Sequence, residues 1–273
     1  SPALLLRFFR RNGVEPIVCL PHRMHDGYGL KMKHVEEFAD AGVTLLFTVD
    51  TGVASHAEIE TAKTKGMDVI VLDHHHFTQR PPAHAVLHPS LSQLPPPHPP
   101  SAAGVVFAFL HALEKEHWAG REEDMALAAI GTIADVVTLR GDNRRLVTEG
   151  LAAMNRLAPS PLQAMLAGVP RGQRLTSTDI AFRVAPRINA AGRMADPTLA
   201  LSAILEGGDG MQTLEQLNME RQAETARCIE HALLSIDPTG KLDHESLPAF
   251  LCVASEDYPP GILGLISGKL TER

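Results

Sequence analysis

The stretch that decides the fold covers residues 44–76 and reads TLLFTVDTGVASHAEIETAKTKGMDVIVLDHHH. An apolar run ends at Asp50, a polar helical segment over residues 54–65 is closed by Gly66, and a second apolar run ends at Asp73. An apolar run, a helix and another apolar run predict a βαβ unit, which builds parallel sheet. Both strands then end at the same edge of the sheet, where open α/β sheets hold their ligands.

The two strand ends carry side chains that bind divalent metal ions. Asp50 follows the first strand, and Asp73, His74 and His75 follow the second. Carboxylate and imidazole ligands without thiolate suit Mn, Mg, Zn or Fe better than a structural zinc site. The alternative is that Asp50 caps the next helix and that the histidines form a solvated loop. Acids at both strand ends beside a His-His pair favour the metal interpretation.

A third acid lies in an apolar setting further along the chain. Asp135 stands within IADVV, residues 133–137. A carboxylate in such surroundings is costly unless it is paired or bound to a metal. It is either a cap for the following segment or, as we favour, a metal ligand brought in beside Asp50 and His74.

Composition limits the class of protein. Of the 273 residues 44% are hydrophobic but only 4% aromatic, so a core of Leu, Ala, Val and Ile is expected. Three cysteines lie far apart without a CxxC pair, which indicates a reducing compartment. No apolar run is long enough for a membrane span and no signal peptide is visible, so we expect a soluble cytoplasmic protein without membrane contact. The net charge of −7 does not indicate nucleic-acid binding, although a basic patch can be local.

The rest of the chain predicts mostly helices. We expect short strands over residues 16–20, 85–87 and 247–254, and the helices cover residues 3–11, 33–41, 102–116, 124–133, 143–157, 197–206, 211–235 and 262–270. The α, β, α, β order at the start leads us to expect a further strand before Ser1. The long polar helix that follows a glycine break is typical of a bridge between domains.

A basic segment, RVAPRINAAGR, covers residues 183–193. Its three arginines, an asparagine and a glycine can hold phosphate through guanidinium groups and backbone amides. A solvated basic helix end is the alternative.

Taken together, these motifs resemble the DHH phosphoesterases, and within them the RecJ-type single-strand-specific exonucleases. The motif DHH alone is a weak signal, whereas PRINAAGRM together with DGYGL is specific to the RecJ-like branch. The matching segments are HDGYGL at 25–30, VDTG at 49–52, DHH at 73–75, IADVV at 133–137, PRINAAGRM at 186–194 and PPGILGLISGKL at 259–270.

The resemblance implies an α/β fold with a parallel-sheet DHH phosphoesterase domain, a helical extension, a long connecting helix and the start of a second α/β domain, DHHA1. On this pattern, residues 1–158 form the DHH catalytic domain, 159–209 its helical part, 210–236 the connecting helix and 237–273 the beginning of DHHA1. Two departures stand out. The family's first acidic D-x-D motif is not in this sequence, so we expect a fragment in which one metal ion lacks most ligands. Pro259 also stands where the family usually has histidine.

The resemblance further implies a pair of Mn²⁺ or Mg²⁺ ions that activate water for attack on a phosphodiester. Asp50 would bridge both ions, while His74 and Asp135 would ligate one of them. Asp73 would orient His74 without binding an ion itself, and His75 would contact the scissile phosphate.

Substrate and partners follow from the same resemblance. Arg187, Asn189 and Arg193 would line the path of the nucleic acid. The implied reaction releases mononucleotides 5′ to 3′ from single-stranded DNA during repair and recombination, with repair or single-strand-binding proteins as possible partners. The alternatives are a DHH phosphodiesterase for small nucleotides or oligonucleotides, and a non-catalytic DHH replication scaffold.

Overall fold

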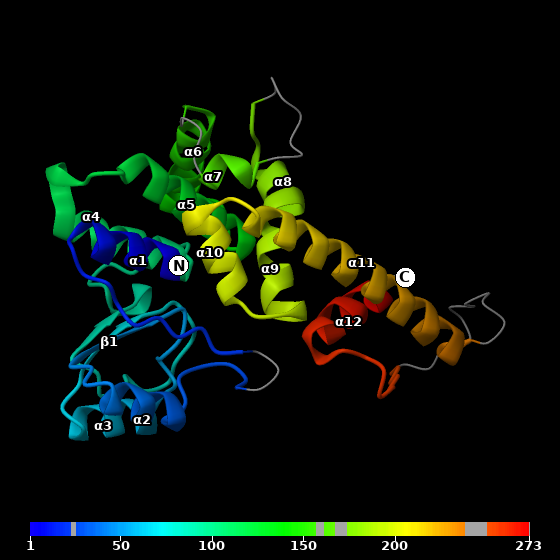
Figure 1. Ribbon diagram of the computed structural model, residues 1–273, viewed down its shortest axis with the longest axis horizontal. Coiled ribbons are helices and arrows are strands. Elements are labelled where there is room, and N and C mark those ends of the chain that lie inside the picture. The colour runs from blue at the N-terminus through cyan, green and yellow to red at the C-terminus, as the bar shows by residue number, and fades with distance from the viewer. Residues whose placement is uncertain (23–25, 157–160, 167–173, 238–249, 273) are drawn as a thin grey trace.

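The computed structural model describes residues 1–22, 26–156, 161–166, 174–237 and 250–272 (Figure 1). It is a mixed α/β structure with a small parallel sheet and many helices. The strands are β1 (Leu45–Val49), β2 (Asp68–Leu72) and β3 (Ala85–Leu87), hydrogen-bonded in the order β1-β2-β3. This confirms the predicted βαβ unit and the short strand after it.

The strands are apolar because helices cover both faces of the sheet. On one face, α3 (His56–Thr64) and α2 (Met32–Asp40) pack against a cluster that includes the fully buried Val69 and Val71. On the other face, α1 (Pro2–Arg11) and α4 (Ala102–Glu114) pack around Leu72. A sheet that is buried on both faces reads as continuous hydrophobic runs, as the sequence does here.

Further helices lie beyond α1 and α4 and extend away from the sheet (Figure 1). Most of them lie within a few residues of the predicted ranges. They are α5 (Arg121–Ala134), α6 (Gly141–Arg156), α7 (Pro161–Ala164), α8 (Ser177–Asp179), α9 (Ala185–Met194), α10 (Thr198–Glu206), α11 (Gly210–Ile236) and α12 (Leu263–Thr271), with short 3₁₀ turns at Pro89–Leu91 (η1), Lys115–His117 (η2) and Pro260–Ile262 (η4).

A π-helical turn, η3 (Ile180–Val184), joins α8 to α9. The N–H of Ala185 donates to the carbonyl of Ile180, five residues back. The next residue is Pro186, which has no N–H to donate and whose ring would collide with the carbonyl of Phe182 in a regular α-helix. The wider turn removes that conflict, and such turns are frequent at functional sites.

The long helix α11 extends from the helical part, and the last described segment returns along it (Figure 1). Cys228 and Ala232 of α11 pack with Tyr258, Ile262 and Ile266 in one buried cluster. The Nδ1 atom of His231 lies 2.7 Å from the Tyr258 hydroxyl, which fastens the returning segment to the helix.

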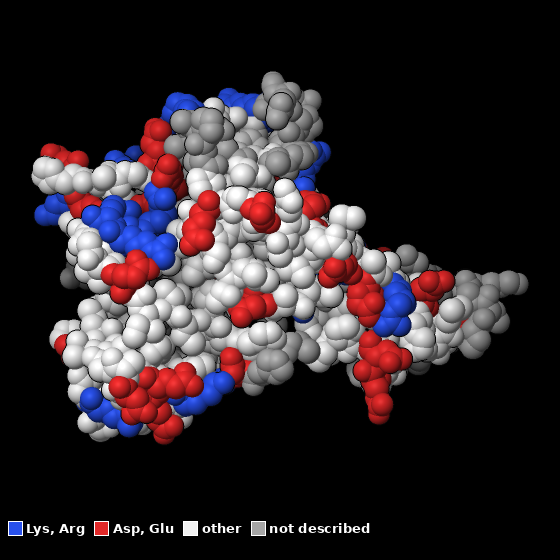
Figure 2. All heavy atoms as spheres, in the orientation of Figure 1, with Lys and Arg blue, Asp and Glu red and all other residues white. Residues whose placement is uncertain are grey.

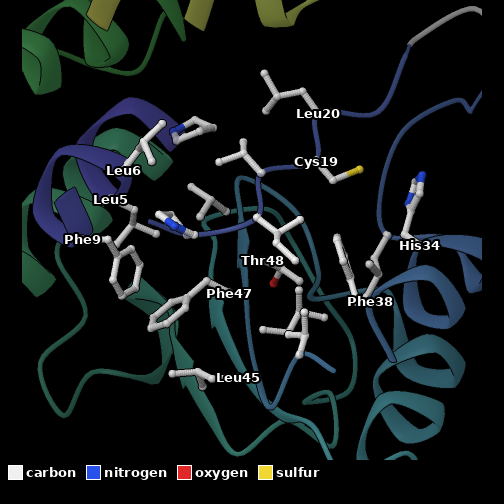
Figure 3. A pocket seen from close by; sticks show the side chains of 18 of the residues that line it. Leu5, Leu6, Phe9, Cys19, Leu20, His34, Phe38, Leu45, Phe47 and Thr48 are labelled. Atoms are coloured by element: carbon white, nitrogen blue, oxygen red, sulfur yellow. The ribbon is translucent and has the colours of Figure 1, made fainter. Parts of the chain in front are cut away.

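Two predicted strands are wrong where the structure describes them. Residues 16–20 have no regular secondary structure, and no backbone hydrogen bond joins them to β1. Instead, this segment and β1 line an apolar cavity of about 470 Å³, into which Leu6, Phe9 and Phe47 project (Figure 3). Pro16 and Pro21 flank the segment, and proline cannot donate to a ladder.

The strand expected over residues 247–254 lies partly outside the described residues. Its described part, 250–254, has no strand assignment, so the final segment reaches α12 as irregular chain. No sheet partner for this segment is present among the described residues.

None of the described helices has both the length and the apolar character needed to cross a membrane.

Candidate metal centre

Asp50 reaches the site through an unusual backbone conformation. Its N–H donates to the carbonyl of Leu72 at 2.9 Å, which extends the pairing of β1 with β2 by one residue. The backbone then enters the left-handed region, with φ of 63° at Asp50 and 110° at Gly52. Asp tolerates this conformation better than most residues do. The turn places the carboxylate at the carboxyl edge of the sheet.

Asp73 organises the DHH loop from inside the protein. Its fully buried carboxylate accepts hydrogen bonds from the backbone N–H of His74 at 2.8 Å, of His75 at 3.2 Å and of Val53 at 3.2 Å. Its Oδ1 atom also lies 2.7 Å from Nδ1 of His75. The contact of Asp73 with an imidazole is therefore with His75, and it holds His74 through the backbone. The role of Asp73 in orienting His74, which the resemblance implies, stays a prediction.

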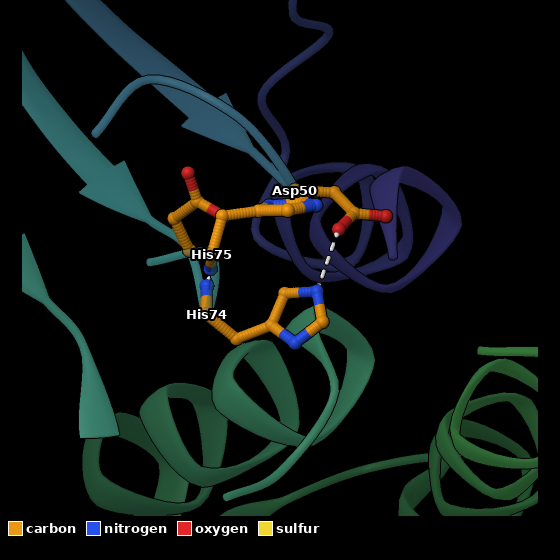
Figure 4. A group of neighbouring side chains, drawn as sticks. Asp50, His74 and His75 are labelled. Carbon is orange, nitrogen blue, oxygen red and sulfur yellow. Dashed lines mark hydrogen bonds and ion pairs between the residues drawn. The ribbon is translucent and has the colours of Figure 1, made fainter. Parts of the chain in front are cut away.

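His74 projects into the space between two acids. Its Nε2 atom lies 3.3 Å from Oδ1 of Asp50 and 3.5 Å from Oδ2 of Asp135 (Figure 4 shows the first contact). Nε2 is buried and makes no aligned hydrogen bond. Its two carboxylate contacts are long and poorly aligned, and a cation between the imidazole and the carboxylates would give all three groups a closer partner.

The donor set fits a divalent cation. One ligand atom from each of Asp50, Asp73, His74 and His75 can be chosen so that all lie within 4.8 Å of one another. Since the oxygens of Asp73 already accept backbone hydrogen bonds, Asp50, His74 and Asp135 are the better candidates to hold the ion. Imidazole and carboxylate together suit a borderline or hard metal such as Mn²⁺ or Mg²⁺.

The pKa shifts follow from this crowding. Burial works to raise the pKa of Asp50, but the contact with His74, the N-terminal ammonium group and the charge of His75 together outweigh burial and lower the pKa. The Asp50 carboxylate raises the pKa of His74, against the effect of burial. Burial raises the pKa of Asp135, and the Asp50 charge adds to that rise. Asp50, His74 and Asp135 therefore lie close enough to shift one another's pKa.

Asp135 is placed by the end of a helix. It is the C-cap of α5, and its N–H donates to the carbonyl of Gly131 at 3.0 Å. The C-terminal end of a helix carries partial negative charge, which also attracts a cation. The next residue, Val136, has φ of 59° and is 87% exposed. A β-branched residue in this region is a strained outlier, and it turns the chain sharply after Asp135.

Tyr28 belongs to the site although no role was predicted for it. Its hydroxyl donates to the backbone carbonyl of Asp50 and lies 3.2 Å from Nδ1 of His75. The rings of Tyr28 and His75 meet edge to face with centroids 5.6 Å apart. Burial, with the charges of Asp73 and Asp50, raises the pKa of Tyr28 to about 12, so the hydroxyl keeps its proton. The motif DGYGL, which contains Tyr28, is the sequence feature that could have indicated this role.

The predicted nucleic-acid residues lie together on α9. Arg187 forms an ion pair with Glu215 of α11, and Nη1 of Arg193 donates to the carbonyl of Gly261 at 3.1 Å. Asn189 is exposed. Both arginines thus link α9 to the C-terminal part of the chain, and their predicted contact with nucleic acid stays a prediction.

Comparisons with known proteins identify the family of this chain. The family described as "DHH family, N-terminal domain" matches residues 1–135. A crystal structure of exonuclease RecJ bound to manganese superposes with a TM-score of 0.87 at 33% identity, covering 99% of this chain and 69% of that one. The chain belongs to the DHH family. A second DHH structure, RecJ in complex with Mn²⁺ from Thermus thermophilus, gives a TM-score of 0.83 at 32% identity, covering 99% of this chain and 39% of that one.

Curated relatives of this DHH chain carry the name single-stranded-DNA-specific exonuclease RecJ. The protein from Thermus thermophilus is 35% identical over 276 residues, covering 99% of this chain and 40% of the relative. The protein from Escherichia coli is 30% identical over 294 residues, covering all of this chain and 51% of the relative. The chain therefore spans about half the length of these relatives or less.

Proposed function

We propose that this chain is the core of a metal-dependent exonuclease that hydrolyses single-stranded DNA, in the 5′ to 3′ direction, during DNA repair and recombination. The observation that carries the proposal is the buried Nε2 of His74, which faces the carboxylates of Asp50 and Asp135 without a hydrogen-bond partner. The names of the curated relatives support the choice of substrate.

The ion expected at this site is Mn²⁺ or Mg²⁺, held by Asp50, His74 and Asp135. When bound, such an ion polarises a phosphoryl oxygen and lowers the pKa of a bound water. Both RecJ structures described above are complexes with manganese, which supports this choice.

The other residues of the site either position the metal ligands or contact the substrate. Asp73 holds the backbone of the DHH loop, so that His74 keeps its place between the acids. His75 is partly exposed, and its Nδ1 lies against the Asp73 carboxylate. A proton on that Nδ1 would leave Nε2, which lies 3.3 Å from the Tyr28 hydroxyl, to contact the scissile phosphate when protonated or through water. Tyr28 fixes the strand end that carries Asp50.

The nucleic acid would run past α9, where Arg187, Asn189 and Arg193 would contact its backbone. Figure 2 shows no continuous basic stripe on the face it displays: Lys and Arg gather over α1, and acidic side chains predominate over α2 and α3. The basic segment on α9 is therefore a better candidate for phosphate contacts than an extended basic surface. Repair or single-strand-binding protein partners and a cytoplasmic location stay predictions.

The test is Mn²⁺-dependent digestion of a long single-stranded DNA labelled at its 5′ end, alongside a ladder of short oligonucleotides and an Asp50→Asn control. Release of labelled mononucleotide from the long strand, lost in the control, is the expected result. Cleavage of the short oligonucleotides alone would point to a small-nucleotide phosphodiesterase. Strand binding without cleavage of either substrate would point to a scaffold.

A further inference from the structure

A histidine at the end of β3 contacts the DHH loop from the outside. The Nε2 atom of His88 lies 2.9 Å from the backbone carbonyl oxygen of His75. The N–H groups of His74 and His75 are bonded to Asp73, so His88 reaches the same short loop from its carbonyl side. We propose that His88 is a positioning residue, which fixes His75 for its contact with the substrate phosphate.

The hydrogen bonds around His88 define its protonation. The backbone N–H of Ser90 donates to Nδ1 of His88 at 3.1 Å, and the Ser90 hydroxyl lies 2.8 Å from the same atom. Because a backbone N–H can only donate, Nδ1 must be the acceptor. The ring proton is then on Nε2, which donates to the carbonyl of His75. His88 is thus a neutral imidazole with both nitrogens in use.

The ring of His88 is also held by packing. It is the residue that caps the 3₁₀ turn η1, and its backbone is extended, with φ of −146° and ψ of 138°. The ring of Phe77, which lies just beyond the DHH loop, meets it edge to face with centroids 4.8 Å apart. His88 therefore starts from a fixed strand end and arrives at the loop in one orientation.

This support matters because His75 has few other constraints. Its side chain is 45% exposed, and its polar contacts are with Asp73 and the Tyr28 hydroxyl. If the carbonyl of His75 were released, the peptide plane between His75 and His76 could rotate, and the ring would lose its defined approach to a phosphate. A displacement of about 1 Å in a catalytic group lowers rates by up to about a hundredfold. The inference rests on the proposed function, in which His75 touches the substrate.

Two substitutions separate the hydrogen bond from the packing. His88→Phe keeps an aromatic ring against Phe77 but removes both ring nitrogens, the donor to His75 and the acceptor for the Ser90 N–H. His88→Gln places an amide N–H near the position of Nε2 and removes the ring. For loss of one hydrogen bond we expect kcat for single-stranded DNA to fall about tenfold in His88→Phe, with KM within about twofold, and His88→Gln to restore most of kcat.

A second measurement does not depend on activity. Hydrogen exchange at the amides of His74 and His75 should be about tenfold faster in His88→Phe than in the wild type, while exchange in α4 stays unchanged. Thermal unfolding of each variant checks that it is folded. If the wild type cleaves nothing, the proposed function fails, and the exchange rates still test the positioning. Unchanged exchange in His88→Phe, or a His88→Gln variant as impaired as His88→Phe, would overturn the inference.

Discussion

Arg193 and Gly261 contact each other twice. The Nη1 atom of Arg193 donates to the carbonyl of Gly261 at 3.1 Å, and the carbonyl oxygen of Arg193 lies where a side chain on Gly261 would begin. A Cβ atom on Gly261 would be 2.1 Å from that oxygen. Only glycine allows the two backbones to come this close, so this pair fixes how the C-terminal segment meets α9.

Gly261→Ala should therefore destabilise the contact. Because the obstructing atom belongs to the backbone, we expect a loss of about 1–3 kcal/mol in the free energy of unfolding, measured by denaturant titration. Gly264→Ala is the matched control, since a Cβ there meets nothing within 4 Å and a helical alanine is favoured by up to about 1 kcal/mol. Equal stabilities for the two variants would contradict the close approach.

Asp50→Asn should weaken metal binding while the protein stays folded. The amide keeps the shape of the side chain but removes the charge that faces Nε2 of His74 at 3.3 Å. We expect Mn²⁺ affinity, measured by calorimetry, to fall at least about tenfold. Asp68→Asn is the control, because Asp68 pairs with the exposed His84 at the start of β2, away from the carboxyl edge. A normal affinity in Asp50→Asn would remove Asp50 from the ligand set.

Val136→Asn should stabilise the protein. Val136 has φ of 59° and is 87% exposed, so the substitution relieves backbone strain and removes little packing. Asparagine accepts the left-handed region, and we expect a gain of about 1 kcal/mol in unfolding free energy. The same change at Val14, which is 49% exposed and has no positive φ, should give no such gain. A loss of stability at position 136 would show that the valine side chain has a packing role.

Asp124 is the centre of a buried ionic network that joins α1 to α5. Its carboxylate accepts from Nε of Arg7 at 2.6 Å, Nη1 of Arg11 at 2.8 Å and Nε1 of Trp118 at 2.8 Å. Asp124→Asn removes the carboxylate that both arginines share, although Arg7 keeps Glu123 and Arg11 keeps Glu114, and we expect a loss of about 1.5–3 kcal/mol.

An exposed ion pair provides the comparison for that network. Glu149→Gln removes the partner of Arg145 on α6, where both side chains are largely exposed, and should cost less than about 1 kcal/mol. If both variants lose the same small amount in thermal unfolding, the network around Asp124 contributes no more than a surface pair.

Arg187→Ala should weaken binding of single-stranded DNA more than binding of Mn²⁺. The guanidinium is paired with Glu215 and only 15% exposed, so DNA would have to compete with that carboxylate. Glu215→Gln should then strengthen DNA binding. Both effects can be measured as DNA affinity by fluorescence anisotropy at several salt concentrations. Arg145→Ala on the exposed face of α6 is the control. Unchanged DNA affinity in both Arg187→Ala and Glu215→Gln would leave Arg187 a purely structural role.

Hydrophobic periodicity was sufficient to predict the centre of the fold. The runs before Asp50 and Asp73 form β1 and β2, because a strand covered on both faces must be apolar throughout. Residues 16–20 have the same apolar character and form no strand. Local sequence shows that a segment is apolar and extended, but a ladder also needs a neighbour in register, which lies elsewhere in the chain.

The site was predictable to a similar degree. Strand ends placed Asp50 and His74 at one edge, and the structure brings Asp135 to within 3.5 Å of His74. The contact between Asp73 and the His75 ring depends on a tight loop, and the place of Tyr28 depends on how a distant segment packs. Neither relationship leaves a periodic pattern in the sequence.

The π-helical turn before α9 has a consequence for the direction in which that helix faces. A turn with one extra residue rotates everything after it by about 100° relative to an uninterrupted α-helix. Arg187 and Arg193 both follow the turn. The widened Ile180–Val184 turn before Pro186 therefore sets the side of α9 from which they project. Pro186, whose nitrogen cannot donate a hydrogen bond, thus helps to set which neighbours Arg187 and Arg193 face.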